Sequence, residues 1–600
     1  MTELNFKGKE FVWNHHLTVP FRPLEPHPEK GIGEPKLDGN LVIHGDNLHA
    51  LKALLPTYAG KVDCVFIDPP YNTGNEGWCY NDNVNAPMIR EWLDSNPVGI
   101  EDGLRHDKWC AMMWPRLRLL WELLSDNGAL FVICDDNESA RLRLMLEEVC
   151  SEGSYIASIV WQKVFAKKNK AVISGSHDTI HIFSKKGLAW ERNLLQRSEQ
   201  QEGDFTNRDD DPRGPWQSVS FSVQTEDAEK RKDYRYEIPL PSGRKVGPPE
   251  GRHWNGLPPR FEELLADNRI WFGSDGDSRP RVKVFLSEVQ SGIVPDTWWT
   301  HQEFGNNQEA KRELNEIFSE GDVFPTPKPL ALLDGVIAIA TKPDSIVLDS
   351  FAGSGTTAHA VLRANKRDGG NRRFILAEME DYADRLTAER VRRVINGYDF
   401  TGTQRTELLR EKLSWSKLKK ADKLQEEIEK IENLHGHEYD AIKKTVTDGV
   451  LVVTGEKRIE ERAEGLGGTF TYCTLGPPIE LDKVLTGEAL PEWEALGAVL
   501  FHAATLKPFD PAASNADAGY LGKGPERHVW LLYKPDRDWL RSPEAALTLS
   551  RAREIHETDP ETRHLVFAPA RHVAQKMLDE RDLNVEFAPL PFALYGLEGG

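Results

Sequence analysis

Short apolar runs alternate with amphipathic stretches through the first 190 residues of the chain. The runs LVIHG from Leu41 and VDCVFID from Val62 have the length and composition of buried strands. Apolar residues from Trp109 to Leu124 recur at spacings of three and four, which predicts a helix that ends before the sequence DNG. The runs ALFVICD, SIVWQK and TIHIFSK predict further strands. This alternation of strands and helices predicts a parallel, doubly wound α/β sheet.

The pattern changes between about residues 190 and 300. Pro and Gly interrupt short charged segments there, yet the region holds Trp216, Trp254 and Trp271, which favours an inserted module over a linker. Strand and helix patterns resume at Phe324, and the charged stretch 404–445 predicts a helical spacer. We therefore expect an N-terminal arm (1–39), two halves of one α/β core (40–189 and 301–400), the inserted module (190–300), a helical spacer (401–450) and a C-terminal α/β domain (451–600).

Composition limits the class of protein. A chain of 600 residues with 39% hydrophobic and 28% charged residues is typical of an ordered protein with several domains. The six cysteines form no C-x-x-C pair, so we expect reduced core cysteines and a cytoplasmic location. No apolar run approaches the length of a membrane span, and we expect no membrane partner. The net charge of −20 argues against a broad electrostatic grip on nucleic acid, but it is compatible with a local basic cleft.

The strand from Val62 ends in Asp68-Pro69-Pro70-Tyr71, at the edge where open α/β sheets bind ligands. Methylation of an aromatic amine requires acceptors for its hydrogens, because its lone pair is delocalised into the ring. Asp68 and the carbonyl of Pro69 can supply two acceptors, and the prolines restrict that carbonyl. Tyr71 can stack on a base rotated out of a duplex. We expect these four residues to be catalytic through positioning and electrostatics. A strand-ending turn with a tyrosine lid is the alternative.

A second strand-to-helix turn, DSFAGSGTT, runs from Asp349 to Thr357. Its glycines allow a ligand to approach the backbone closely, but it lacks the lysine of a phosphate loop and the third glycine of a dinucleotide fingerprint. The turn therefore suits S-adenosylmethionine. Glu378 ends the next strand, 29 residues after Asp349, and we expect it to bind the ribose hydroxyls. An ordinary acidic strand end is the alternative.

The order of these two motifs resembles that of the β class of amino-methyltransferases, which share a circularly permuted Rossmann-like fold. The blocks NLVIHGDNLHALKALL, DPPYNTG, TWWTHQEFGNNQEAKRELNEIF, FPTPKPLALL and DSFAGSGTT, within about residues 40–395, resemble the modification subunits of type III restriction-modification systems. The resemblance implies N6 methylation of a flipped adenine, and Asp68 in place of serine favours adenine over cytosine. It also implies that Asp46 lies near the adenine of S-adenosylmethionine, although Asp46 is equally a candidate N-cap for the next helix. The cofactor-binding residues that it implies are Asp349, Phe351, Gly353, Gly355, Thr356 and Lys328.

By the same resemblance, residues 190–300 stand where a target-recognition domain is expected. The stretch 191–300 carries 16 Lys and Arg against 20 Asp and Glu, so contacts with DNA phosphates must be local. The implied partners are double-stranded DNA, a second copy of the chain in a homodimer, and a restriction subunit. The alternatives are methylation of cytosine N4 and a DNA-recognition subunit in which methylation is secondary. The candidate DNA-binding residues are Lys163, Lys167, Lys168, Arg244, Lys245, Arg279 and Arg281, with Arg231 and Lys283 in neighbouring basic clusters.

Overall fold

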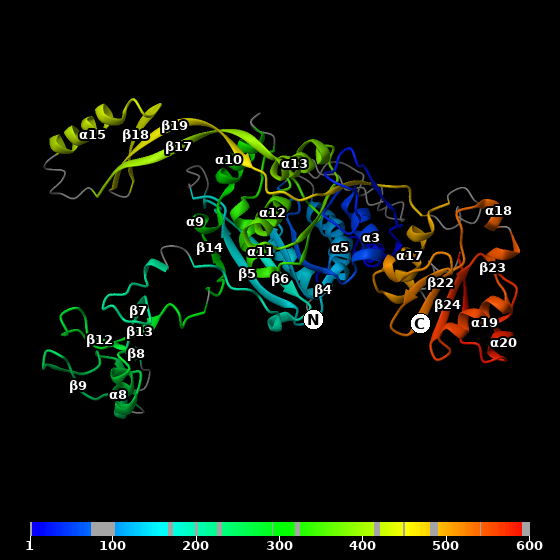
Figure 1. Cartoon of the computed structure of the whole chain (residues 1–600), viewed down its shortest axis with the longest axis horizontal. Helices are drawn as coiled ribbons and strands as arrows, with labels where there is room; N and C mark the ends of the chain where they lie inside the picture. The colour runs from blue at the N-terminus through cyan, green and yellow to red at the C-terminus, as the bar shows by residue number, and fades with distance from the viewer. Residues whose placement is uncertain are drawn as a thin grey trace. The chain divides into compact units, whose positions relative to one another are not determined.

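The computed structural model divides the chain into two compact units. One unit is Asn193–Pro295, and the other combines Met1–Arg192 with Asp296–Gly600. The first unit nearly coincides with the module expected at 190–300. Figure 1 colours both units by residue number. The residues that the structure describes are 3–73, 103–165, 172–197, 202–224, 231–290, 292–318, 324–412, 421–447, 450–479, 490–540 and 542–590.

A large mixed sheet is the centre of the bigger unit. Among the described residues its strands lie in the order β1-β20-β2-β16-β15-β3-β4-β6-β5-β14. The pairs along β20, β2, β16, β15, β3 and β4 are parallel. The strand bounds are β1 Leu24–Pro26, β2 Leu41–His44, β3 Val62–Ile67, β4 Leu124–Cys134, β5 Tyr155–Gln162, β6 His177–Ser184, β14 Trp298–Trp299, β15 Ile346–Asp349, β16 Arg373–Glu378 and β20 Thr471–Leu475.

Helices cover this sheet on both faces. Val65, Ile67 and Leu348 belong to one apolar cluster with buried residues of α3, α5 and α6. Because side chains alternate along a strand, Phe66 and Val347 point to the opposite face, and α11 and α12 contact β3, β15 and β16 outside that cluster. The helix bounds are α3 Asn47–Tyr58, α5 Arg105–Leu123, α6 Ser139–Val149, α11 Leu330–Ala340, α12 Thr356–Asp368 and α13 Glu389–Asn396.

The expectation of a wholly parallel sheet is wrong at one side. Strand β6 pairs antiparallel with both β4 and β5. Parallel neighbours need a crossover connection, usually a helix. The sequence KVFAKKNKAVISGS between β5 and β6 lacks the apolar periodicity of such a helix, so the two strands pair antiparallel.

The two ends of the expected core also differ from the sequence-based boundaries. Strand β20 pairs parallel with β2, and β1 pairs antiparallel with β20. Segments expected in the C-terminal domain (451–600) and in the N-terminal arm (1–39) therefore complete the central sheet. Neither FTYCTL nor LEP stands out as a strand in the sequence, because their apolar character is modest.

The helical spacer expected at 401–450 is only partly helical. Strand β17 (Gly397–Lys412) pairs antiparallel with β19 (Val450–Glu464) from end to end, and β18 (Ala441–Thr447) pairs with β19 on its other side. A helix remains at α15 (Ala421–His435). Cross-strand pairing along the whole of β17 outweighs the helical propensity of its charged residues.

The expected small α/β region is present near the C-terminus. Strands β22, β24 and β26 are parallel, β21 pairs antiparallel with β22, and α17 packs against α3 of the core. The five cysteines of the described residues are buried and unbonded, as predicted. No helix within the described ranges has the length and apolar character needed to cross a bilayer. The bounds are α17 Trp493–Thr505, β21 Tyr520–Lys523, β22 Arg527–Leu531, α19 Leu549–Thr558, β24 Arg563–Ala568 and β26 Val585–Pro589.

Candidate active site

Four neighbouring parallel strands bring the predicted site residues to one edge of the sheet. Strands β2, β16, β15 and β3 lie side by side, and Glu378 is in register with His44. Asp46 follows β2, Glu378 ends β16, Asp349 ends β15 and Asp68 follows β3. The carboxyl ends of parallel strands form the ligand-binding edge of open α/β sheets. Two motifs far apart in the sequence therefore form one site.

Asp68 forms an ion pair through Oδ2 with the ammonium of Lys328. The side chain of Asp68 is 23% exposed and that of Lys328 is 11% exposed. The second oxygen, Oδ1, is buried and has no hydrogen-bond partner among the described residues. A buried acceptor without a partner costs free energy. Asp68 Oδ1 is therefore available to a ligand that brings a donor.

Two lysine–aspartate pairs contact Tyr71. The hydroxyl of Tyr71 donates to Asp178 Oδ2 over 3.1 Å, and Asp178 Oδ1 accepts from the Lys163 ammonium over 2.6 Å. The ammonium groups of Lys328 and Lys163 are 5.0 Å and 5.7 Å from the centroid of the Tyr71 ring. Burial, followed by the charges of Asp68 and Asp178, raises the pKa of Tyr71 well above its usual value. The phenol therefore stays protonated and acts as a donor.

The rest of the D-P-P-Y turn is held by α5 and by the segment before α6. The indole of Trp109 donates to the carbonyl of Pro70 over 2.7 Å. Asn72 is fully buried at a φ of 56°, a left-handed conformation that Asn tolerates. Its amide donates to the Arg105 carbonyl over 3.2 Å and to the carboxylate of Glu138. These contacts fix the backbone of the turn.

Two glycines with positive φ shape the turn between β15 and α12. Gly353 has a φ of 50° and Gly355 a φ of 77°. A Cβ on Gly355 would lie 3.0 Å from the Thr387 carbonyl, so a side chain there would displace backbone. Arg390 of α13 is buried beneath the turn and donates to Thr356 Oγ1 over 2.7 Å. The positive φ of both glycines and the hydrogen bond from Arg390 thus define the backbone of the turn.

Asp349 and Glu378 are buried carboxylates that hold the same turn. Asp349 accepts from the Thr357 hydroxyl over 2.6 Å and from the Phe351 N–H over 3.0 Å. Glu378 accepts from the Gly353 N–H over 2.8 Å. Burial raises the pKa of Asp349 to about 7 and that of Glu378 to about 7. A carboxylate has about four lone-pair sites, so Glu378 can accept further hydrogen bonds from a ligand.

Asp46 caps helix α3. Its carboxylate accepts from the Leu48 N–H over 2.7 Å, which confirms the N-cap alternative. The next residue, Asn47, donates to the carbonyl of Ser350 over 2.9 Å and accepts from the buried Arg116 over 2.6 Å. The start of α3 is therefore tied directly to the glycine turn.

The residues at this edge fit S-adenosylmethionine. Asp68 Oδ1 and Ser350 Oγ are buried without a hydrogen-bond partner in the described part of the chain. Asp349 and Glu378 add potential negative charge, which suits a cationic sulfonium ligand and opposes a phosphate. A cation nearby would also favour their ionised forms. Glu378 would hold ribose hydroxyls, and the glycine turn would lie against the ligand.

The candidate DNA-binding residues differ in the partners that they have within the protein. Lys163 pairs with Asp178 beside Tyr71, and Lys167 and Lys168 lie outside the described residues. In the unit Asn193–Pro295, Arg244 makes a two-pronged ion pair with Asp277. Lys245 is largely exposed, and its carboxylate neighbour Glu237 is 3.9 Å away. Arg279 donates to the carbonyl of Gly247, and Arg281 donates to Ser218.

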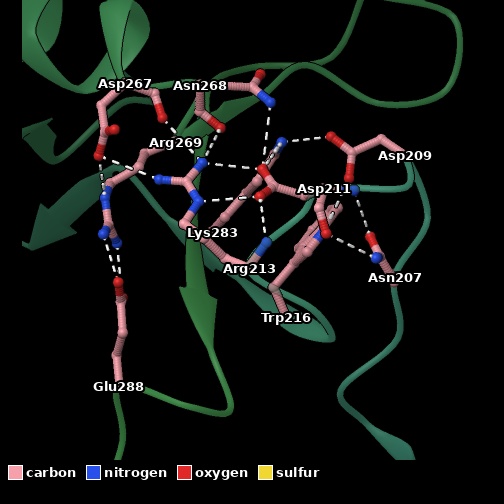
Figure 2. A network of polar contacts seen from close by, with 10 residues as sticks. All are labelled: Asn207, Asp209, Asp211, Arg213, Trp216, Asp267, Asn268, Arg269, Lys283 and Glu288. Carbon is pink, nitrogen blue, oxygen red and sulfur yellow. Dashed lines mark hydrogen bonds and ion pairs between the residues drawn. The ribbon is translucent and has the colours of Figure 1, made fainter.

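A network of ion pairs lies inside the same unit (Figure 2). Lys283 is 1% exposed and pairs with Asp209 and Asp211. Asp211 also accepts from Arg213 over 2.9 Å, and this hydrogen bond holds the pKa of Asp211 well below its usual value. Arg269 pairs with Asp267 and with Glu288. Lys283 is therefore internal, and the expectation that it contacts DNA is corrected.

Two surface cavities of this unit differ in charge. One has a volume of about 460 Å³, and its arginines Arg260 and Arg269 have carboxylate partners. The other has a volume of about 610 Å³ and no carboxylate among its described lining residues. Arg231, Tyr234 and His253 line it, and the Arg231 guanidinium is 5.1 Å from the Tyr234 ring. The second cavity combines cationic and aromatic groups.

Several residues of the site are not apparent from the sequence. Asp178 and Trp109 hold the D-P-P-Y turn, and Arg390 supports the glycine turn. An acidic residue at the start of the apolar strand TIHIFSK is a weak signal for Asp178. Nothing in the sequence distinguishes Arg390 from other helical arginines. Phe351 lies half-buried against the core at the glycine turn, and its contact with the cofactor stays a prediction.

Comparison with known proteins identifies the family. The sequence profile described as DNA methylase matches residues 62–389, which is more than half of the chain. The chain therefore belongs to the DNA methylase family. It is 33% identical to the type III restriction-modification enzyme StyLTI Mod subunit of Salmonella typhimurium, over 63% of this chain and 58% of that protein. It is 29% identical to the EcoPI Mod subunit of Escherichia phage P1, over 58% of each chain. It is also 29% identical to the type II methyltransferase M.KpnI of Klebsiella pneumoniae, over 56% of this chain and 79% of that one. The chain thus spans somewhat more than half of the two Mod subunits.

Proposed function

We propose that this chain is a site-specific DNA methyltransferase that transfers a methyl group from S-adenosylmethionine to the N6 amine of a flipped adenine. One observation carries the proposal. Asp68 presents a buried oxygen at the end of β3 that has no hydrogen-bond partner in the described ranges of the chain, and the glycine turn follows the adjacent strand β15. An acceptor for an amine and a turn for the methyl donor are therefore built on neighbouring strands.

The protein groups would act by orienting the amine. Asp68 accepts one N–H of the amine and the carbonyl of Pro69 accepts the other, which draws the lone pair out of conjugation and toward the donor. Tyr71 provides the surface on which an unstacked base lies. The bound cofactor would supply an electrophilic methyl group with a neutral thioether as the leaving group, and the methylated nitrogen would give up one proton to the Asp68 carboxylate that accepts its N–H. Such catalysis depends on position and preorganised acceptors.

The ion pair between Lys328 and Asp68 must open for this reaction. The ammonium of Lys328 lies over the Tyr71 ring, where the target base is proposed to stack, and it binds Asp68 Oδ2, next to the Oδ1 that is proposed to accept the amine. Lys328 would move toward the cofactor's carboxylate when the base enters. The pair is partly exposed, so opening it is inexpensive compared with opening a fully buried pair.

The unit Asn193–Pro295 would serve as the target-recognition domain. Its charged residues largely neutralise one another, so phosphate contacts would come from the few cations that remain. We assign this role first to Lys245 and Arg231, which are exposed. Arg244, Arg279 and Arg281 are already engaged within the unit and would contribute less.

The partners follow from the relatives. Two of them are named Mod subunits of type III restriction-modification enzymes. We propose that this chain is likewise the modification component of such a system, that it acts as a homodimer on double-stranded DNA, and that a restriction subunit can join it. A cytoplasmic location agrees with this role.

Product analysis tests the proposal and its alternatives. The full chain is incubated with duplex DNA and S-adenosylmethionine carrying a labelled methyl group, and the DNA is digested to nucleosides. N6-methyl-2′-deoxyadenosine as the labelled product supports the proposal, and modification-sensitive sequencing then gives the target site. N4-methylcytosine alone would instead establish the cytosine alternative, because that amine presents the same chemistry. Site-specific binding without any labelled nucleoside would establish a recognition subunit.

A further inference from the structure

The ion pair of Asp178 and Lys163 lies at the edge of the central sheet, between strand β6 and the end of β5. Asp178 lies on β6 and is 2% exposed, and it pairs in register with Trp161 of β5. Lys163 directly follows β5. One oxygen of Asp178 accepts from the Tyr71 hydroxyl and the other from the Lys163 ammonium. The carboxylate is therefore fixed by its strand, by a cation and by the tyrosine.

Of the two lysine–aspartate pairs at Tyr71, one must open when a base enters and the other can stay intact. The Lys328 ammonium lies over the Tyr71 ring and binds Asp68 beside the oxygen that the amine must reach, so this pair has to open. Asp178 instead binds the hydroxyl end of Tyr71, and a base can lie on the ring without breaking that bond. One pair is displaced by the target, and the other stays in place.

We propose that Asp178, held by Lys163, is a positioning residue that fixes the plane of the Tyr71 ring on which the target base stacks. The backbone of Tyr71 is already fixed by the motif, and the hydrogen bond to Asp178 fixes the opposite end of the ring. A hydrogen bond to an ionised carboxylate is stronger and more directional than one between neutral groups. Lys163 binds one oxygen of this buried carboxylate and orients the other toward Tyr71, so its role is at the tyrosine instead of at a DNA phosphate. This inference rests on the proposed function.

A double-mutant cycle on the full chain tests the proposal. Tyr71→Phe removes the hydroxyl, and Asp178→Asn leaves a single acceptor oxygen for which the Lys163 ammonium competes with Tyr71; both changes weaken or remove the same hydrogen bond with little change in shape. We expect each to lower kcat about tenfold and to leave the KM for DNA and the cofactor Kd within about threefold. The double variant is expected to be no slower than Tyr71→Phe alone, because the second change removes nothing further. Independent, multiplying effects of the two changes would overturn the proposal.

A spectroscopic measurement separates positioning from general damage. DNA with 2-aminopurine at the mapped target adenine is bound to each variant, and its fluorescence reports how tightly the flipped base stacks. We expect brighter fluorescence with Asp178→Asn than with the wild type. Lys163→Met should behave like Asp178→Asn, and Lys163→Arg should restore wild-type values because it retains the cation. Unchanged fluorescence in Asp178→Asn would contradict the proposal.

The controls distinguish this inference from the proposed function. Glu147→Gln changes a carboxylate of α6 that pairs with Arg143, and we expect wild-type kinetics. Tyr71→Phe leaves the Asp178–Lys163 pair intact, so it gives the same test if Asp178→Asn does not fold. Wild-type kinetics for Asp178→Asn, beside an inactive Asp68→Ala, would overturn the inference alone. A wild-type chain that methylates no DNA would overturn the proposed function itself.

Discussion

Buried carboxylates in the two units of the molecule have opposite surroundings. At the sheet edge, burial raises the pKa of Asp349 and of Glu378 to about 7, and Asp68 keeps an oxygen without a partner among the described residues. In the unit Asn193–Pro295, Asp211 is equally buried, but Arg213 and Lys283 bind it and its pKa lies well below its usual value.

The difference lies in whether the protein supplies the partners. A carboxylate whose oxygens all accept hydrogen bonds from charged groups of its own chain needs no ligand, and its role is to stabilise the fold. A carboxylate that is buried without enough donors is costly until a ligand arrives. Burial alone therefore does not indicate a functional residue, whereas burial with unused acceptor capacity does.

The largest expected effect comes from Asp68→Ala. This change removes the acceptor proposed for the target amine, so methyl transfer should fall by roughly a thousandfold or more. Binding of S-adenosylmethionine, measured by calorimetry, should stay within about threefold of the wild type. Asp136→Asn, which alters a carboxylate that is 76% exposed, is the control and should leave transfer unchanged. Substantial activity in Asp68→Ala would remove the basis of the proposed chemistry.

The next largest effect is expected from Asp211→Ala, which should lower the free energy of unfolding. It leaves the buried Lys283 with one carboxylate fewer, and removing one partner of a buried pair costs roughly 3 kcal/mol. Urea unfolding with hydrogen exchange should locate the loss in residues 193–295, with cofactor binding preserved. Asp277→Ala, which breaks an exposed pair with Arg244, should leave the free energy of unfolding almost unchanged. An equal loss of unfolding free energy in both variants would show that the buried pair and the exposed pair do not differ in stabilising the fold.

The affinity for S-adenosylmethionine should change about tenfold between pH 6 and pH 8. With a pKa near 7, Glu378 is mostly protonated at pH 6 and mostly ionised at pH 8. Hydroxyl donors and a cationic ligand favour the ionised form. The Kd for S-adenosylmethionine should therefore fall about tenfold between these pH values in the wild type, and less in Glu378→Gln. An identical pH profile in the two proteins would separate Glu378 from the cofactor.

The same group should affect stability without ligand in the opposite direction. The folded-state pKa of Glu378 is raised from 4.5 to about 7, so between these values the folded state binds more protons than the unfolded state. Its contribution is fully present below about pH 4.5 and is lost as the pH rises through about 7. Glu378→Gln should flatten this part of the unfolding free-energy profile, measured with urea in the absence of cofactor. An unchanged slope would show that Glu378 does not titrate there.

The smallest effect is expected from Arg231→Ala. An arginine that contacts one phosphate contributes about one unit to the slope of log affinity against log salt, so the variant should bind DNA a few-fold more weakly with a slope lower by about 1. Arg244→Ala should change the slope less, because Asp277 already neutralises that guanidinium. Fluorescence anisotropy at several salt concentrations measures both. A larger effect from Arg244→Ala would reverse the assignment.

The two motifs are predictable from the sequence because each follows a short apolar strand. In a parallel sheet, a residue just after a strand must lie at the carboxyl edge, so the sequence alone assigns Asp68, Asp349 and Glu378 to one edge. The N-cap at Asp46 is predictable for a similar local reason. These inferences need only strand ends, not strand order.

The residues that sequence reasoning misses depend on strand order and long-range pairing. Asp178 contacts Tyr71 across 107 residues because β6 runs antiparallel beside β4, which no local pattern indicates. The charged stretch at 397–412 forms a strand because β19 pairs with it along its length. Lys283 resembles a surface cation in the sequence, but its carboxylate partners lie more than 70 positions earlier in the chain.

The position of strand β20 in the sequence delays completion of the central sheet in the newly made chain. It borders β2, the strand that leads to Asp46, but it is synthesised more than 400 residues later. At translation rates of about 5 to 20 residues per second, β2 waits on the order of 20 to 90 seconds for this neighbour. During that interval its backbone edge is open to other pairing partners, a hazard that sheet proteins generally guard against. The sheet that carries the cofactor-binding residues is therefore completed only after Leu475 has been synthesised.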